Sequence, residues 1–101
     1  MKKKKVGETE LKRWRNLQAA DVLVRLAEYA KKDSTFVPIK NPSSTRWHVN
    51  IDNSYFEILC NDAKFWDTRA EKGGGGALDL IMHLCSADFR TAVEILRVKG
   101  I

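Results

Sequence analysis

The stretch from Thr35 to Thr68 constrains the fold most, because it divides into short segments rich in β-branched and aromatic residues. The sequences that separate these segments are "NPSS", "DN" and "ND", all built from residues that tolerate turn geometry. Connections this short join strands that are antiparallel neighbours. We therefore predict a four-stranded antiparallel meander, with strands at residues 36–40, 46–51, 55–59 and 64–68.

Sequences with a helical spacing of apolar residues lie on both sides of this meander. Residues 17–32 are rich in helix formers and predict a first helix, which Asp33 and Ser34 end. The apolar residues expected on one face of this helix are Ala20, Leu23, Val24, Ala27 and Ala30. Residues 77–85 predict a short second helix with a wide apolar surface.

Residues 86–101 predict a third helix. Ser86 or Asp88 can cap its start, and Gly100 is a typical stop signal. The residues expected to face inward are Phe89, Ala92, Val93 and Leu96. Together these elements predict an α+β domain, in which a small antiparallel β-meander is flanked by an N-terminal helix and two C-terminal helices.

Four consecutive glycines, Gly73 to Gly76, separate the meander from the second helix. A Walker-type phosphate loop requires Lys and Ser or Thr after the loop, and "GGGGALD" supplies neither; the dinucleotide-binding spacing fails because position 78 is Leu78. The carboxylate of Asp79 would itself occupy the positive end of the following helix. The glycines therefore predict a tight reversal between a strand and a helix rather than a phosphate site.

Length and composition predict a single domain without a membrane span. The chain has 101 residues, of which 44% are hydrophobic, and no apolar run approaches the roughly 18 residues of a membrane helix. The two cysteines, Cys60 and Cys85, lie far apart in the sequence and form no paired motif. We therefore expect a reduced, cytoplasmic protein.

Positive charge is concentrated at the N-terminus. Residues 1–15 contain seven basic and two acidic residues, whereas the other 86 residues contain equal numbers of each sign. We predict that residues 1–16 form a basic, flexible arm and that residues 17–101 form the folded domain. Such an arm either contacts nucleic acid or is a solvated tail that aids solubility.

Five stretches occur in an order that resembles one known domain. They are "ADVLVRLAEYAKK", "STRWHVNIDNSYFEI", "KFWDT", "GGGGALDLIMHL" and "DFRTAVEILRVKGI". From about Gln18 to its end, the chain resembles the N-terminal zinc-binding (zinc-ribbon) domain of bacterial DNA primases. The resemblance implies a zinc-ribbon-primase-like fold that contacts single-stranded template during replication and priming.

The metal ligands of that family are missing. The family holds zinc with a Cys-x-x-His pair and a Cys-x-x-Cys pair, but "TRWH" retains only His48 and "DTRAEKGG" contains no cysteine. A structural zinc site needs four ligands, and His83 and Cys85 are two residues apart on a predicted helix, so they face different directions. We expect a zinc-less relative without metal or cofactor, as found beside Toprim-type primase domains in plasmids and other mobile elements.

Hydrophobic side chains are expected to fill the space that the metal occupies in the family. The candidates are Trp47, Phe56, Phe65 and Trp66. No catalytic constellation is recognisable, and the carboxylates that hold magnesium in a primase belong to a separate domain of the family. We therefore expect that the chain is not an enzyme by itself.

Two functions remain open. The first is binding of single-stranded DNA, because aromatic and basic residues alternate in "RWH" and "KFW", as in surfaces on which bases stack. The residues predicted to bind nucleic acid are Lys2, Lys3, Lys4, Lys5, Lys12, Arg13, Arg15, Arg46, Lys64, Trp66 and Arg69. The second is a protein-interaction adaptor for a polymerase, helicase or primase, which the neutral charge of residues 16–101 suits equally well.

Overall fold

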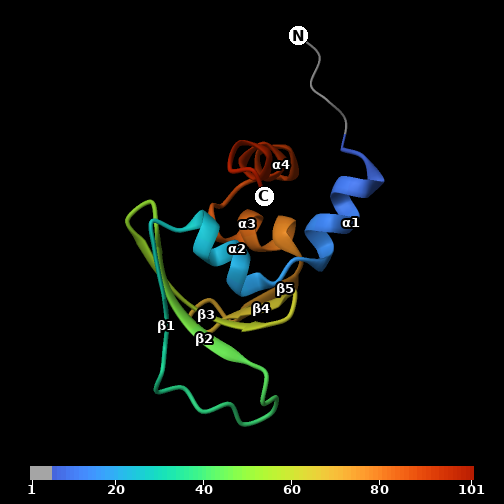
Figure 1. Cartoon of the computed structure of the whole chain (residues 1–101). Coiled ribbons are helices and arrows are strands. Elements are labelled where there is room, and N and C mark those ends of the chain that lie inside the picture. Colours follow the sequence, from blue (N-terminus) through green and yellow to red (C-terminus); the bar gives the residue numbers. More distant parts are fainter. Residues whose placement is uncertain (1–5) are drawn as a thin grey trace.

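The computed structural model describes residues 6–101 and shows an α+β fold. Its helices and strands, in chain order, are α1 (Glu8–Asn16), α2 (Ala19–Leu26), β1 (Tyr29–Lys32), β2 (Thr45–Ile51), β3 (Ser54–Asn61), β4 (Lys64–Asp67), β5 (Lys72–Gly75), α3 (Ala77–Leu84) and α4 (Phe89–Val98). The predicted class is confirmed: along the chain, an antiparallel meander follows two N-terminal helices and precedes two C-terminal helices. Figure 1 shows that these helices lie on one side of the sheet.

The sheet has five strands in the order β1-β2-β3-β4-β5, and every neighbouring pair is antiparallel. The predicted strands at 46–51, 55–59 and 64–68 correspond to β2, β3 and β4, although β4 ends at Asp67. The strand predicted at 36–40 is wrong, because these residues lie in the connection between β1 and β2. Pro38 has no N–H group to donate to a sheet, and Tyr29–Lys32 pairs with Trp47–Asn50 instead.

The first predicted helix is shorter than expected. Residues 17–32 divide into α2, which ends at Leu26, and the strand β1. Ala27 already has an extended backbone, with φ −77° and ψ 147°, and its N–H donates to the carbonyl of Leu23. The predicted face is also rotated, because Ala19, Val22, Leu23 and Leu26 are buried whereas Val24 is exposed.

Helices cover one face of the sheet and leave the other free. In Figure 1, α2 and α3 lie against the sheet, and α4 packs on the far side of α3. The core residues of the sheet are Val49, Ile51, Ile58, Cys60 and Phe65. Those of α2 and α3 are Ala19, Val22, Leu23, Leu26, Ala77, Leu80, Ile81 and Leu84. The core therefore lies between the sheet and these two helices, and within the described part of the chain no helix covers the opposite face of the sheet.

The N-terminal segment is part of the fold from Glu8 onward, so the prediction of a flexible arm through residue 16 is wrong there. Helix α1 packs against α3 and buries Trp14 almost completely, at 1% exposure. The indole Nε1 of Trp14 donates a 3.2 Å hydrogen bond to the carbonyl oxygen of Ile101. Arg97 and Glu10 form an ion pair with an N–O distance of 2.6 Å that joins α4 to α1. Residues 1–5 lie outside the described part of the chain.

The glycine run has two structural roles. Gly76, with φ +90°, makes the predicted reversal into α3, but Gly73, Gly74 and Gly75 belong to the edge strand β5. A Cβ atom on Gly73 would lie 2.7 Å from the carbonyl oxygen of Phe65 and 2.7 Å from Cε3 of Trp66. Bare backbone is therefore required at Gly73 because the Trp66 ring of β4 lies directly against it.

The start of α4 is confirmed in part. Asp88 caps this helix, because its Oδ1 accepts a 2.8 Å hydrogen bond from the backbone N–H of Thr91. The predicted inward residues Ala92, Val93 and Leu96 are buried. Phe89 was expected to face inward but is 49% exposed, since it is the first residue of the helix and lies beyond the apolar stripe.

Candidate nucleic-acid interface

The sheet face that carries no helix presents the residues that alternate with the core residues of β1 to β4. Their positions follow from the register: Arg46, Leu59, Trp66 and Gly73 are aligned across four strands. We call this surface the open face. It consists of Tyr29, Lys31, Arg46, His48, Asn50, Tyr55, Glu57, Leu59, Asn61, Lys64 and Trp66.

Trp66 is the largest side chain on the open face. The residue is 45% exposed, although it lies in the middle of β4. One edge of its ring system lies against Gly73, and Leu59 is its neighbour on β3. The indole is therefore fixed by backbone on one side and remains accessible to a ligand on the other.

Tyr55 is the second exposed aromatic residue of the open face. It is 46% exposed, and its hydroxyl group is hydrogen-bonded to Nδ1 of His48. The rings of His48 and Tyr55 are nearly parallel, with an interplanar angle of 10° and centroids 5.8 Å apart. The guanidinium carbon of Arg69, from the turn after β4, lies 5.4 Å from the centroid of the Tyr55 ring. Tyr55 is thus held by both neighbours.

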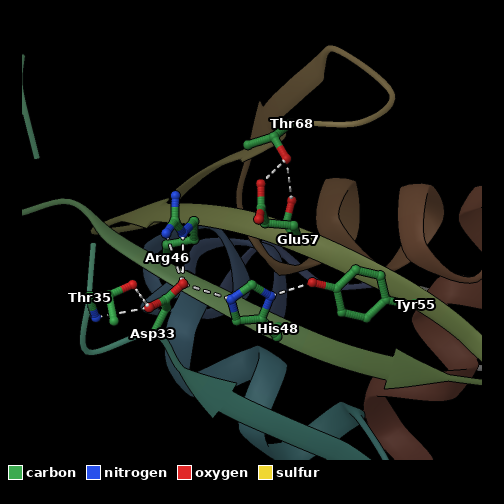
Figure 2. A network of polar contacts seen from close by, with 7 residues as sticks. All are labelled: Asp33, Thr35, Arg46, His48, Tyr55, Glu57 and Thr68. Carbon is green, nitrogen blue, oxygen red and sulfur yellow. Dashed lines mark hydrogen bonds and ion pairs between the residues drawn. The ribbon is translucent and has the colours of Figure 1, made fainter. Parts of the chain in front are cut away.

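A network of hydrogen bonds and ion pairs around Asp33 lies at one edge of the open face (Figure 2). The carboxylate of Asp33 accepts hydrogen bonds from the backbone N–H and the hydroxyl of Thr35, at 2.9 and 2.6 Å, and from Nε of Arg46 at 3.0 Å. Nε2 of His48 lies 2.8 Å from the same carboxylate. The hydrogen bonds from Thr35, His48 and Arg46 hold the pKa of Asp33 well below its usual range.

This network changes the role of Arg46. Its guanidinium group is engaged by Asp33, with an N–O distance of 2.9 Å, and it packs against the ring of Phe36 with its carbon 5.0 Å from the ring centroid. Arg46 therefore holds the start of the β1–β2 connection in place, and its positive charge is already paired with Asp33. Glu57 is likewise engaged, because Thr68 donates a 2.6 Å hydrogen bond to its carboxylate, as Figure 2 shows.

Three cations remain around the exposed rings. Lys31, Lys64 and Arg69 are exposed, and within residues 6–101 none of them forms an ion pair. The carboxylates of Asp33 and Glu57 are held by hydrogen bonds within the protein. The surface can therefore offer aromatic rings for stacking together with unpaired cations for phosphate groups.

The structure divides the predicted binding residues into two groups. Arg46, Lys64, Trp66 and Arg69 lie on or beside the open face. The predicted residues of α1 are on the helical side of the sheet (Figure 1). Of these, Arg13 is a structural residue, because it donates a 3.2 Å hydrogen bond to the carbonyl of Ile101 and packs on the Trp14 ring.

The other residues of the N-terminal segment that were predicted to bind nucleic acid lie away from the open face or outside the described part of the chain. Lys12 and Arg15 are exposed on α1, away from the sheet face that carries Trp66. Lys2, Lys3, Lys4 and Lys5 lie outside the described residues. The structure therefore does not bring the basic residues of α1 and the basic residues of the sheet together into one site.

Sequence reasoning did not include Tyr55, Glu57, His48 or Lys31 among the predicted binding residues. Tyr55 and Glu57 alternate with the buried strand residues in "YFEIL", so a two-residue period was the signal that could have found Tyr55. His48 was considered as a remnant of a metal site and as part of the "RWH" pattern, but not as a binding residue. Lys31 was missed because residues 17–32 were predicted to be one helix, whereas this residue lies in β1 opposite His48.

A polar pair joins the end of β4 to α3. Asp67, at the end of β4, is buried, and its carboxylate accepts hydrogen bonds from the backbone N–H groups of Arg69 and Ala70 at 3.0 and 3.1 Å. Its other oxygen lies 2.6 Å from Nε2 of His83 on α3. This contact ties the β4–β5 turn to the helical layer.

The pKa of Asp67 reflects two opposing effects. Burial raises this pKa, but the hydrogen bonds from His83 and from the amides of Ala70 and Arg69 outweigh burial and lower it overall. Of the four hydrophobic side chains expected to fill the metal space, Trp47 and Phe56 are partly buried against the core. Phe65 is buried and its ring contacts that of His83 with centroids 5.9 Å apart, whereas Trp66 points to the open face.

Neither cysteine shows the features of a ligand or a nucleophile. Cys60 is buried, and burial raises the pKa of its thiol to about 12. Burial also raises the pKa of Cys85. Across residues 6–101, no cluster of three or more His, Cys, Asp or Glu side chains is arranged to hold a metal ion.

Comparisons with known proteins give limited information. No protein-family profile and no solved structure matches the chain. A segment of 41 residues is 46% identical to part of a protein from Zymomonas mobilis subsp. mobilis that is named only "65 kDa protein". The segment covers 41% of this chain but only 7% of that protein. No helix among the described residues is long and apolar enough to cross a membrane.

Proposed function

We propose that this chain is a non-catalytic module that binds single-stranded DNA during replication or priming, and that the open face is its binding surface. One observation supports this most strongly. Trp66 and Tyr55, each about half exposed on a rigid sheet, lie on the same face as Lys64 and beside Arg69. Exposed rings next to phosphate-neutralising cations are the usual means of holding a single strand.

The physical basis is that the rings are already ordered before binding. Trp66 rests against Gly73, and Tyr55 is held between His48 and Arg69. A base that stacks on such a ring costs little side-chain entropy. Every base has a flat face, so this mode of binding tolerates different sequences. The resemblance to the primase domain supports DNA as the nucleic acid, priming as the process, and a plasmid or another mobile element as the setting.

We also propose that the chain has no enzymatic activity by itself. The open face carries the carboxylate of Glu57, and that of Asp33 lies at its edge, bonded to Arg46. Both accept hydrogen bonds from neighbouring side chains, and they lie on different elements rather than as a pair that converges on one metal position. The surface therefore suits binding better than phosphoryl transfer, which requires clustered carboxylates and magnesium.

Fluorescence anisotropy with a labelled oligothymidylate tests the proposal. We expect Trp66→Ala to weaken binding by about 1–3 kcal/mol, the usual contribution of one base stacked on an aromatic ring. Phe89→Ala is the matched control, because Phe89 is an equally exposed aromatic residue on α4. The proposal fails if the parent protein does not bind at low salt, or if both variants bind like the parent.

The alternative is an adaptor for a polymerase, helicase or primase subunit. The exposed aliphatic side chains of Val37 and Ile39, between β1 and β2, favour it. Stable association with such a subunit in the absence of DNA, by a chain that does not bind single strands even at low salt, would support the adaptor function over DNA binding.

A further inference from the structure

The connection between β1 and β2 exposes aliphatic residues to an unusual extent. Val37 is 77% exposed and Ile39 is 96% exposed, with Pro38 between them. Single exposed apolar residues are common, but a contiguous apolar patch on a small domain usually marks a contact surface. Aliphatic side chains do not stack on bases, so the open face does not account for them.

Both ends of this connection are fixed. At its start, the backbone N–H of Asp33 donates to the carbonyl of Arg46 at 2.8 Å, and the Asp33 carboxylate is held as described above. At its end, the carbonyl and the side chain of Asn41 accept hydrogen bonds from the backbone N–H groups of Ser44 and Ser43, each at 3.0 Å. The apolar tip is therefore presented at a defined place, which lowers the entropy cost of binding.

The tip also has unused backbone groups. Within the described residues, Val37, Ile39 and Lys40 donate no backbone hydrogen bond, and the carbonyls of residues 36–40 accept none. A groove of about 300 Å³ separates this segment from Leu59 of β3, and its walls are largely apolar. An extended peptide could pair with the free backbone groups and place an apolar side chain in the groove.

The charge of the surrounding segment indicates the kind of partner. Between residues 29 and 46 the only acidic residue is Asp33, which Arg46 and His48 engage, while Lys31, Lys32 and Lys40 are exposed. Two copies of this surface that faced each other would bring two clusters of exposed lysines together. A partner with acidic residues would instead be attracted.

We propose that residues 36–40 and the groove against Leu59 bind an extended peptide segment of a partner protein, one that carries aliphatic side chains and a carboxylate that faces Lys40. This inference does not depend on DNA binding. Leu59 belongs to the open face and is the cross-strand neighbour of Trp66, so the bound partner would lie on the edge of the open face, next to Trp66.

Selection from a phage-displayed library of random peptides tests the proposal. We expect the parent chain to enrich peptides that combine aliphatic and acidic residues. A synthetic copy of the enriched peptide should bind the double variant Val37→Ser/Ile39→Ser about tenfold more weakly or worse, because truncating buried apolar anchors usually has at least that effect. Val98→Ser is the matched control, since Val98 is 84% exposed on α4 and should not affect binding.

Several results would overturn the proposal. They are the absence of enriched peptides, equal binding by the double variant, and enriched peptides without acidic residues. Self-association of the parent chain that the double variant loses would assign the segment to a second copy. Loss of oligothymidylate binding in the double variant would assign it to the nucleic-acid interface. Measuring both ligands on the same proteins separates this proposal from the DNA-binding proposal, and circular dichroism checks that each variant is folded.

Discussion

At the scale of single residues, Gly73 shows why β5 is built from glycine. Its backbone meets the Trp66 ring so closely that an added Cβ would lie 2.7 Å from Cε3. We expect Gly73→Ala to lower the free energy of unfolding by about 1–3 kcal/mol, the usual cost of overpacking. Gly75→Ala is the control, because its Cβ would meet only Cγ of Lys64, at 4.0 Å. Urea denaturation measures the stability of both variants. Equal midpoints would show that the packing of Trp66 does not require glycine at residue 73.

Asp67 gives a second prediction at this scale. The side chain is buried and bonded to His83, so Asp67→Asn should cost about 1.5–3 kcal/mol, the contribution of a hydrogen bond to a charged group. The folded-state pKa of Asp67 is lowered, so its stabilisation is present above the unfolded-state pKa of about 3.9 and is lost as the pH falls below it. Thermal melting between neutral and acidic pH should show a shallower dependence in the variant. A parallel dependence in both proteins would contradict this assignment.

At the scale of elements, we predicted the strands whose side chains are typical of a sheet. We missed the strands that form mainly because their backbone pairs with a neighbouring strand. The strands β2 and β3 were predicted because segments rich in β-branched and aromatic residues lie between turn signals. β1 was missed because "YAKK" has helix-forming residues and becomes a strand only by pairing with β2. β5 was missed because three glycines have no side-chain pattern, and their pairing with β4 involves backbone alone.

Helix α1 was missed for a different reason. Charged residues dominate its sequence, and its only fully buried side chain is Trp14. The prediction that follows is that Trp14→Ala destabilises the domain by about 3–5 kcal/mol, as other large-to-small core substitutions do. Lys12→Ala, an exposed residue of the same helix, should leave the stability nearly unchanged. If chemical denaturation gives the same midpoint for both variants, α1 does not belong to the cooperative unit.

At the scale of the whole molecule, the chain has one covered and one open sheet face, and the proposed functions belong to the open side. The alternation of basic and aromatic residues in "KFW" placed Lys64 and Trp66 among the predicted binding residues, and the structure shows both exposed beside the buried Phe65. The sequence could not show that Arg46 is engaged by Asp33, because these residues are brought together only by the pairing of β1 with β2. The sequence also does not show that the basic residues of α1 lie away from the open face, because their position depends on the packing of α1 against α3.

An NMR titration of the isotope-labelled chain with oligothymidylate tests directly whether the open face binds single-stranded DNA. We expect the amide and side-chain resonances of five open-face residues to shift together and to saturate with one dissociation constant: His48, Tyr55, Leu59, Lys64 and Trp66. The resonances of Trp14 and of α4 should not shift. Shifts confined to α1 or α4, or no shifts at low salt, would contradict the claim that the open face binds single-stranded DNA.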